Sequence, residues 1–165
     1  MPIQPEPWLR GPIPEIDSVL APVFYSFQQA REDLEQCTLS LTREQLRARP
    51  NGLGSVAFHL LHIAGSTDRL MTYLQGRELS VEQFDRLAME ENSGEFDREE
   101  LLAIVDKAFR QAEAVVRRLD VSSLGEARTV GRLHFPTTVA GLLTHIAEHT
   151  QRHVGQAICV ARFVG

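Results

Sequence analysis

The chain has 165 residues, of which 43% are hydrophobic, and it carries a formal net charge of −5. This length suits one domain that buries a continuous core without disulfides. The negative charge and the lack of a basic stripe argue against nucleic acid or an anionic membrane as the main partner, so a small-molecule substrate is expected instead.

Signals for export or membrane insertion are weak. The N-terminus has no apolar core of a signal peptide, and the longest nearly apolar run, residues 56–65, is about half the length of a membrane-spanning helix. Cys37 and Cys159 each stand alone in the sequence. A cytoplasmic protein is therefore expected, with both cysteines as small buried hydrophobes.

Prolines mark the start of the chain. Five of the 8 prolines lie in the first fourteen residues, so residues 1–14 are expected to form an extended arm, with Trp8 as its anchor. The domain then spans residues 15–165. From about Ile16, apolar residues recur at intervals of three and four as far as Leu41, which predicts a long amphipathic helix that tolerates Pro22 in its early part.

Capping signals divide the middle of the chain into helices. A Ser, Thr or Asp followed three residues later by Gln or Glu satisfies the backbone N–H groups at a helix start. Ser55 predicts the cap of a long helix that runs to about Gln75, where Gly76 closes it. The full capping pattern occurs three times. Thr42 with Gln45 predicts a short turn before Pro50. Ser80 with Gln83 predicts a short helix to about Met89, and Asp97 with Glu100 predicts a long helix to about Leu119.

The last part of the chain begins with an irregular stretch. Residues 120–136 lose the helical period, and brief alternation around residues 129–135 predicts a small extended excursion. Thr137 or Thr138 then caps a last helix that runs to about Phe163. Four long amphipathic helices in one chain predict an all-α four-helix bundle, a fold that often builds metal sites from facing helices.

Three histidines recur at four-residue steps on the last helix: His145, His149 and His153. Such a step advances about 400°, so adjacent members can reach one ion. His149, His153 and Gln156 interrupt the apolar stripe and are expected to point inward, where an unpaired imidazole costs about 1–3 kcal/mol. The histidine pair is therefore either half of a transition-metal site or a pair of hydrogen-bonded core imidazoles.

A metal site needs a third ligand from another helix, and His59 with His62 is the other histidine-rich segment. The two residues lie about 60° apart around their helix. Three protein ligands and an open position are typical of a catalytic site. Imidazole suits zinc, nickel, copper and iron, so the residues do not name the metal.

Two segments resemble the signatures of a known family: HIAGSTDRLMTYLQG from His62 to Gly76, and EHTQRHVGQAI from Glu148 to Ile158. They look like those of the DinB/YfiT-like superfamily, and the likeness covers nearly the whole chain after the arm. It implies an up-down-down-up four-helix bundle, often a homodimer. It also implies a divalent metal ion, zinc or nickel, on His62, His149 and His153.

Other polar residues are assigned around this site. His145 and His59 are expected to act as catalytic proton carriers, with His59 also the fallback ligand. Arg69 lies two turns from His62 on the same stripe and is assigned to an anionic substrate group, with a brace between helices as the alternative. Gln156 is expected just behind the ligands, and His134 on the surface.

The resemblance suggests thiol chemistry first. Its characterised relatives include thiol-dependent S-transferases and a maleylpyruvate isomerase, which use low-molecular-weight thiols, while others are called metal-dependent hydrolases. The first hypothesis is therefore a thiol S-transferase with such a thiol as co-substrate, and hydrolysis is its alternative. The second is a non-catalytic, dimeric binding or stress protein with a structural metal. Neither histidine helix has an evident general-base carboxylate apart from Glu148, which is expected to point away from the core. This absence weakens the hydrolase hypothesis more than the thiol-transfer hypothesis.

Overall fold

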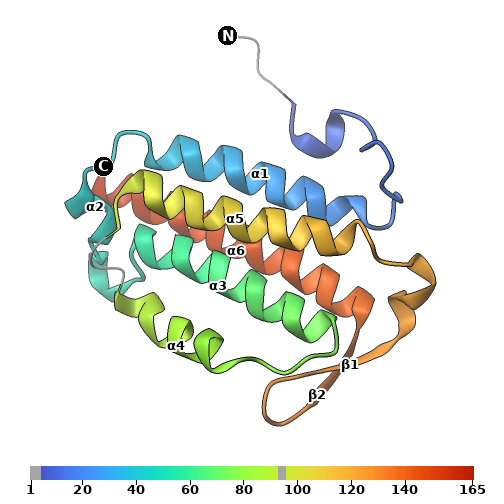
Figure 1. Cartoon of the computed structure of the whole chain (residues 1–165). Helices are drawn as coiled ribbons and strands as arrows, with labels where there is room; N and C mark the ends of the chain where they lie inside the picture. Colours follow the sequence, from blue (N-terminus) through green and yellow to red (C-terminus); the bar gives the residue numbers. More distant parts are fainter. Residues whose placement is uncertain (1–4, 93–95) are drawn as a thin grey trace.

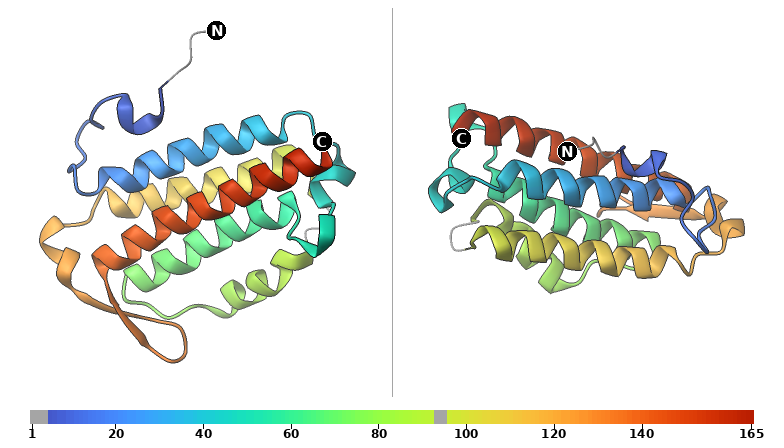
Figure 2. Two further views of the ribbon diagram at one scale, coloured as in Figure 1. Left: turned by 180° about the vertical axis from the view of Figure 1, so that it is seen from behind. Right: turned by 90° about the horizontal axis from the view of Figure 1, so that it is seen from above.

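A computed structural model describes residues 5–92 and 96–165 of the chain. Within these ranges four long helices form a bundle: α1 (Ala21–Thr38), α3 (Val56–Leu74), α5 (Arg98–Val116) and α6 (Val139–Val164). Figures 1 and 2 show that α1 and α6 run in one direction and that α3 and α5 run in the other. The predicted up-down-down-up four-helix bundle is therefore confirmed.

A crossover makes α3 and α5 parallel. After α3, the short helix α4 (Val81–Met89) runs back along the outside of α3, and the single turn η3 (Glu90–Asn92) follows it (Figure 1). The chain thus returns to the end of the bundle where α3 began, and α5 starts from there. This return also brings Glu90 against α3, which matters for the site described below.

Four predicted helix starts agree with the structure. Capping boxes form at the three predicted positions, Thr42, Ser80 and Asp97, so α2 (Arg43–Arg47), α4 and α5 begin as expected. The hydroxyl of Ser55 accepts a hydrogen bond from the backbone N–H of Phe58 and caps α3. A further turn, η2 (Pro50–Gly52), joins α2 to α3.

Two predicted helix boundaries were wrong. The first long helix begins at Ala21 rather than near Ile16, because Pro22 has no N–H and fits only the first turn of a helix. The third long helix ends at Val116 rather than near Leu119. A short turn, η4 (Val121–Gly125), follows it and leads into the irregular stretch.

The predicted extended excursion is a β hairpin. Strand β1 (Ala127–Val130) pairs antiparallel with β2 (Phe135–Thr138), from Ala127 opposite Thr138 to Val130 opposite Phe135. Of the two candidate caps, Thr138 caps α6, since its hydroxyl accepts a hydrogen bond from the N–H of Gly141 at 3.0 Å. The hairpin therefore delivers the chain directly into the histidine-bearing helix.

The bundle core fixes the positions of α3 and α6. Phe27 of α1 and Phe109 of α5 are fully buried, and their rings stack with centroids 4.3 Å apart. Burial of each such side chain contributes about 1.5–3 kcal/mol. The large, fully buried residues that α3 and α6 contribute to the same core are Val56, Leu60, Ile63, Leu74 and Ile146.

The first residues of the arm are held differently than expected. Residues 1–4 lie outside the described part of the chain; beyond them, η1 (Pro7–Leu9) forms one turn. Trp8 is 59% exposed, so the expectation that it anchors the arm was wrong. The contacts that do hold the arm are the burial of Pro7, an ion pair between Arg10 and Glu32 at 2.6 Å, and a hydrogen bond from Tyr25 to the carbonyl of Gly11.

The two cysteines are free thiols in different surroundings. Cys37 is half-buried, and burial raises the pKa of its thiol to about 11. Cys159 is exposed, so the expectation that both are buried was wrong for this residue. Among the helices within residues 5–92 and 96–165, none is long and apolar enough to cross a bilayer.

Candidate metal centre

Three histidines from two helices meet where α3 packs against α6. One ring nitrogen from each of His62, His149 and His153 lies within 4.8 Å of the others, and all three residues are half-buried. The rings of His149 and His153, one turn apart on α6, have centroids 4.6 Å apart. The ring of His62 lies 4.4 Å from that of His153. The structure therefore brings together the three residues that the family resemblance implied as ligands.

The donor set fits a divalent metal ion. A tetrahedral ion with bonds of 2.0–2.1 Å to imidazole nitrogens needs them about 3.3 Å apart, so small side-chain rotations suffice to close the site. Three imidazoles suit zinc, nickel and similar ions. Within residues 5–92 and 96–165, no other group of three or more His, Cys, Asp or Glu side chains gathers its ligand atoms this closely.

Two of the three histidines are held in the neutral form. Burial first, and then the neighbouring His62, lower the pKa of His149 to about 4 and that of His153 to about 3. Both imidazoles are therefore neutral near pH 7. Because a metal ion binds the neutral ring, these two ligands need not release a proton first.

Glu90 orients His62. Its Oε2 lies 2.7 Å from Nδ1 of His62, and its Oε1 accepts a hydrogen bond from Nη1 of Arg69 at 2.5 Å. The Glu90 side chain is only 5% exposed. Because a carboxylate accepts, Nδ1 of His62 carries the proton, and Nε2 is left to bind an ion. A carboxylate behind a ligating histidine fixes the ring and raises its basicity.

Gly65 makes room for this carboxylate. It lies between His62 and Arg69 on α3, and a Cβ atom at position 65 would collide with the carboxylate of Glu90 and the guanidinium of Arg69. One stretch of α3 thus supplies the candidate ligand His62, the space for the Glu90 carboxylate at Gly65, and the counter-ion Arg69. Glu90 was not predicted from the sequence, although a glycine inside a helix and an arginine on the same stripe pointed to a buried partner there.

His59 plays the corresponding part for His153. The Nδ1 atoms of the two rings lie 3.1 Å apart, so one donates and the other accepts. Burial lowers the pKa of His59 to about 4, so both rings are neutral near pH 7 and either nitrogen can accept. With the proton on Nδ1 of His153, its Nε2 is free to bind an ion. His59 thus contacts the candidate ligand His153 from behind, and its use as the fallback ligand stays a prediction.

The other predicted site residues lie outside the cluster of His62, His149 and His153. His145 has a 44% exposed side chain, and its Nδ1 lies 2.6 Å from Glu148, which is exposed as expected. The ring centroid of His145 is 5.2 Å from that of His149. Arg69 is buried against Glu90, the bracing contact that was its alternative role, and its assignment to a substrate remains a prediction. His134 is exposed on the hairpin.

Gln156 does not point inward. Its side chain is exposed, whereas Thr150, Val154 and Ala157 continue the core face of α6, so His149 and His153 flank that face rather than interrupt it. The glutamine of α6 that does join helices is Gln151, whose amide donates to the carbonyl of Ser26 at 2.8 Å. The expected place of Gln156 behind the ligands was therefore wrong.

The lowered histidine pKa values predict acid sensitivity of the metal-free protein. Unfolded, His59, His149 and His153 take up protons near their ordinary pKa of 6.5, but folded they do so only near 4 or 3. The unfolded chain therefore binds more protons in this window, and the free energy of unfolding falls as the pH drops. Each group contributes at most about 1.4 kcal/mol per pH unit, and less where solvent screens it.

Urea denaturation of chelator-treated protein between about pH 7 and about pH 5 measures this effect. The variant His149→Gln is the control, since it removes one of the three groups and should flatten the dependence. Equal slopes for the variant and the parent chain would contradict the assignment.

Comparison with known proteins agrees with the fold. The DinB superfamily model matches residues 26–157. No match was found among curated protein sequences. Among solved structures, the fold is similar to that of YfiT from Bacillus subtilis, with a TM-score of 0.67 and 16% identity over 92% of this chain and 91% of that one. YfiT is described as a probable metal-dependent hydrolase with an unusual four-helix bundle topology. Because the family match spans most of the chain and includes all three clustered histidines, the protein belongs to the DinB superfamily.

Proposed function

We propose that the protein is a metal-dependent enzyme in which His62, His149 and His153 hold one divalent ion, zinc or nickel. The observation that carries the proposal is the meeting of three ligand nitrogens from two helices, within 4.8 Å of one another. A bound divalent ion supplies Lewis-acid chemistry, because it lowers the pKa of a water or a thiol that reaches it. The description of YfiT as a probable metal-dependent hydrolase also supports an enzyme.

The residues around the cluster would orient the ligands and move a proton. Glu90 holds His62 and His59 holds His153, so both rings present Nε2 to the same point. The ring of Phe58 stacks on His62, with centroids 5.4 Å apart, and gives the site one apolar side. His145 is the proton carrier in this proposal: its Nδ1 is engaged by Glu148, which leaves Nε2 to accept a proton from substrate.

We infer thiol transfer ahead of hydrolysis. Glu90 is already bonded to His62 and Arg69, and Glu148 to His145 and Arg152, so both carboxylates of this network are occupied. A thiol, with an ordinary pKa near 8.5, needs less help from a base than water does. A low-molecular-weight thiol is therefore the proposed co-substrate. Hydrolysis stays the second candidate because of the description of YfiT. A homodimer remains a prediction that sedimentation tests.

Metal analysis followed by two activity panels tests the function. The purified chain should retain about one metal ion per chain. Small thiols such as glutathione, cysteine and coenzyme A are then offered with an electrophile that reports conjugation, and nitrophenyl esters are offered without thiol. Metal-dependent conjugation supports the transferase, and metal-dependent ester cleavage supports the hydrolase. A chain that binds the metal but turns over neither panel would favour a non-catalytic protein, and a chain that retains no metal would refute the site.

A further inference from the structure

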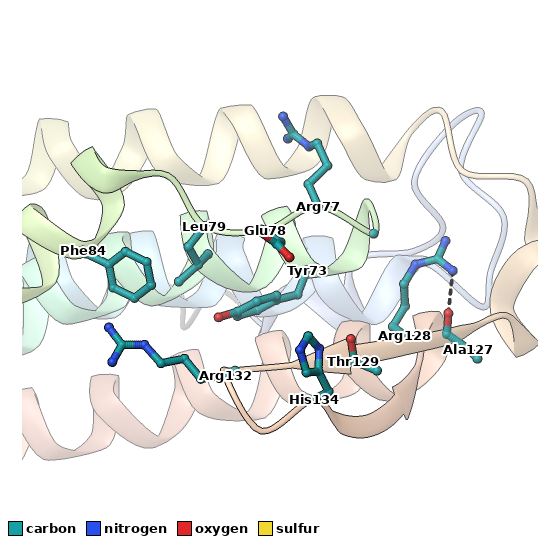
Figure 3. Close-up of a pocket in the computed structure, with 12 residues that line it drawn as sticks. Tyr73, Arg77, Glu78, Leu79, Phe84, Ala127, Arg128, Thr129, Arg132 and His134 are labelled. Atoms are coloured by element: carbon teal, nitrogen blue, oxygen red, sulfur yellow. Dashed lines mark hydrogen bonds between the residues drawn. The ribbon is translucent and has the colours of Figure 1, made fainter.

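A cavity lies where the β hairpin faces the end of α3 and the start of α4 (Figure 3). Its volume is about 650 Å³, within the range of sites that bind small molecules. One side is formed by residues at the end of α3 and around α4, and the other by the hairpin. The lining residues that carry the argument are Tyr73, Glu78, Leu79, Phe84, Arg132 and His134.

This cavity is separate from the histidine cluster. Tyr73 follows His62 by eleven residues on α3, which places it about 16 Å along the helix axis. None of the residues that line the cavity belongs to the cluster of His62, His149 and His153. A small ligand in the cavity would therefore not reach a metal ion held by these histidines.

One wall of the cavity suits a flat apolar ligand. Figure 3 shows the rings of Tyr73 and Phe84 with the side chain of Leu79 between them. Phe84 is exposed although it lies next to the cavity. Aromatic rings bind other rings by offset or edge-to-face stacking, each pair contributing beyond the area it buries. The wall thus offers two rings to a planar partner.

The opposite wall carries an arginine without a polar partner. Among the described residues, Arg132 has no hydrogen bond and no ion pair, and its guanidinium carbon lies 5.4 Å from the centroid of the Phe84 ring. By contrast, Arg128, also in the lining, donates to the carbonyl of Leu74 and pairs with Glu126. The donors of Arg132 are thus available to an anion at the edge of the aromatic wall.

His134 lies in the turn of the hairpin, two residues after Arg132, in a strained conformation. Its φ of 49° is in the left-handed region, which costs an L-residue about 1–2 kcal/mol. Its N–H donates to the carbonyl of Gly131 at 3.1 Å, closing the turn of the hairpin. Figure 3 shows its imidazole between Tyr73 and Thr129, so the strained turn presents a second hydrogen-bonding group to the cavity.

We propose that this cavity binds a planar aromatic carboxylate, with its ring against Tyr73 and Phe84 and its carboxylate on Arg132. The planar fork of arginine matches a carboxylate in two parallel hydrogen bonds. Glu78 lies on the α3 side of the cavity and repels an anion there, which sets the direction of the ligand. The negative charge of Glu78 also favours a ligand with a single negative charge over a phosphate ester with two.

Titration of the full chain with 2-naphthoate tests this proposal. The neutral amide 2-naphthamide has the same shape and should bind about tenfold more weakly, because it lacks the charge. Arg132→Gln should weaken naphthoate binding about tenfold and leave naphthamide binding unchanged. Exposed Arg118, outside the cavity, gives the matched control Arg118→Gln, which should bind naphthoate as the parent chain does.

Three results would overturn the proposal. Equal affinity for naphthoate and naphthamide would show that the anion is not recognised, as would an Arg132→Gln variant that binds naphthoate unchanged. Competition by inorganic phosphate as strong as that by naphthoate would show that the ring contributes nothing. Loss of naphthoate binding in His149→Ala would place the ligand at the histidine cluster instead; unchanged binding there supports a separate site, whatever the metal does.

Discussion

His149→Ala is expected to abolish metal retention during purification and to weaken the binding of zinc or nickel. The loss of affinity should exceed about 10–100-fold, the usual effect of removing a residue that only orients a ligand. In the proposed site His149 supplies one of the three ligand nitrogens, and alanine offers no nitrogen in its place. Alanine is the best helix former, and His149 lies beside the core face rather than in it, so the fold should persist. Competition with a chelating indicator measures the affinity.

His145→Ala is the matched control on the same helix. It lies one turn away and outside the ligand set, and its Nδ1 bonds to exposed Glu148. The variant should keep the metal affinity of the parent chain, but it should lower turnover in whichever panel is active, because the proton carrier is gone. Equal loss of metal in the two variants would show that the ligand set is wrong.

The sequence was most informative where structure depends on neighbours along the chain. The three capping boxes and the Ser55 cap were predicted at the right residues, because each depends on hydrogen bonds between residues three apart. The bundle topology came from the family resemblance rather than from periodicity. Pro22 shows the limit of periodicity, since the apolar pattern runs through it although the helix starts beside it.

The face of α6 was misjudged for a physical reason. Two residues of its core face, Thr150 and Ala157, are nearly or fully buried but are small or polar. Neither stands out in a search for large apolar residues. The stripe was therefore drawn through Gln156, which is exposed. The histidines nevertheless come together with His62, because an i, i+4 pair stays on one side of a helix whichever way that side is turned.

The partners behind the ligands depend on tertiary structure. Glu90 follows a short crossover helix, and it reaches His62 because that helix runs back along α3. No pattern in the local sequence shows that a helix folds back along an earlier one. Likewise, the spacing placed His59 and His62 on one helix. It could not tell which of the two joins the cluster with His149 and His153 and which supports His153 from behind.

Glu90→Ala is expected to lower the free energy of unfolding by about 3–5 kcal/mol, because it leaves a buried arginine without its counter-ion. Arg69 is only 9% exposed, and the carboxylate of Glu90 is its ion-pair partner among the described residues. The double variant Glu90→Ala with Arg69→Met removes both charges and should recover most of this loss. Urea denaturation of metal-free protein measures the three chains.

The same variants separate the role of Glu90 in stability from its role in orienting His62. If the carboxylate fixes the ring and raises its basicity, metal affinity should fall about 10–100-fold in Glu90→Ala and stay low in the double variant, although stability returns. Glu90→Gln, which keeps the shape and an acceptor oxygen but loses the charge, should give an intermediate affinity. Recovery of full metal affinity along with stability in the double variant would mean that Glu90 only neutralises Arg69. Affinity that stays low in a stable double variant would instead assign the carboxylate to the metal centre, because the remaining change is at Nδ1 of His62.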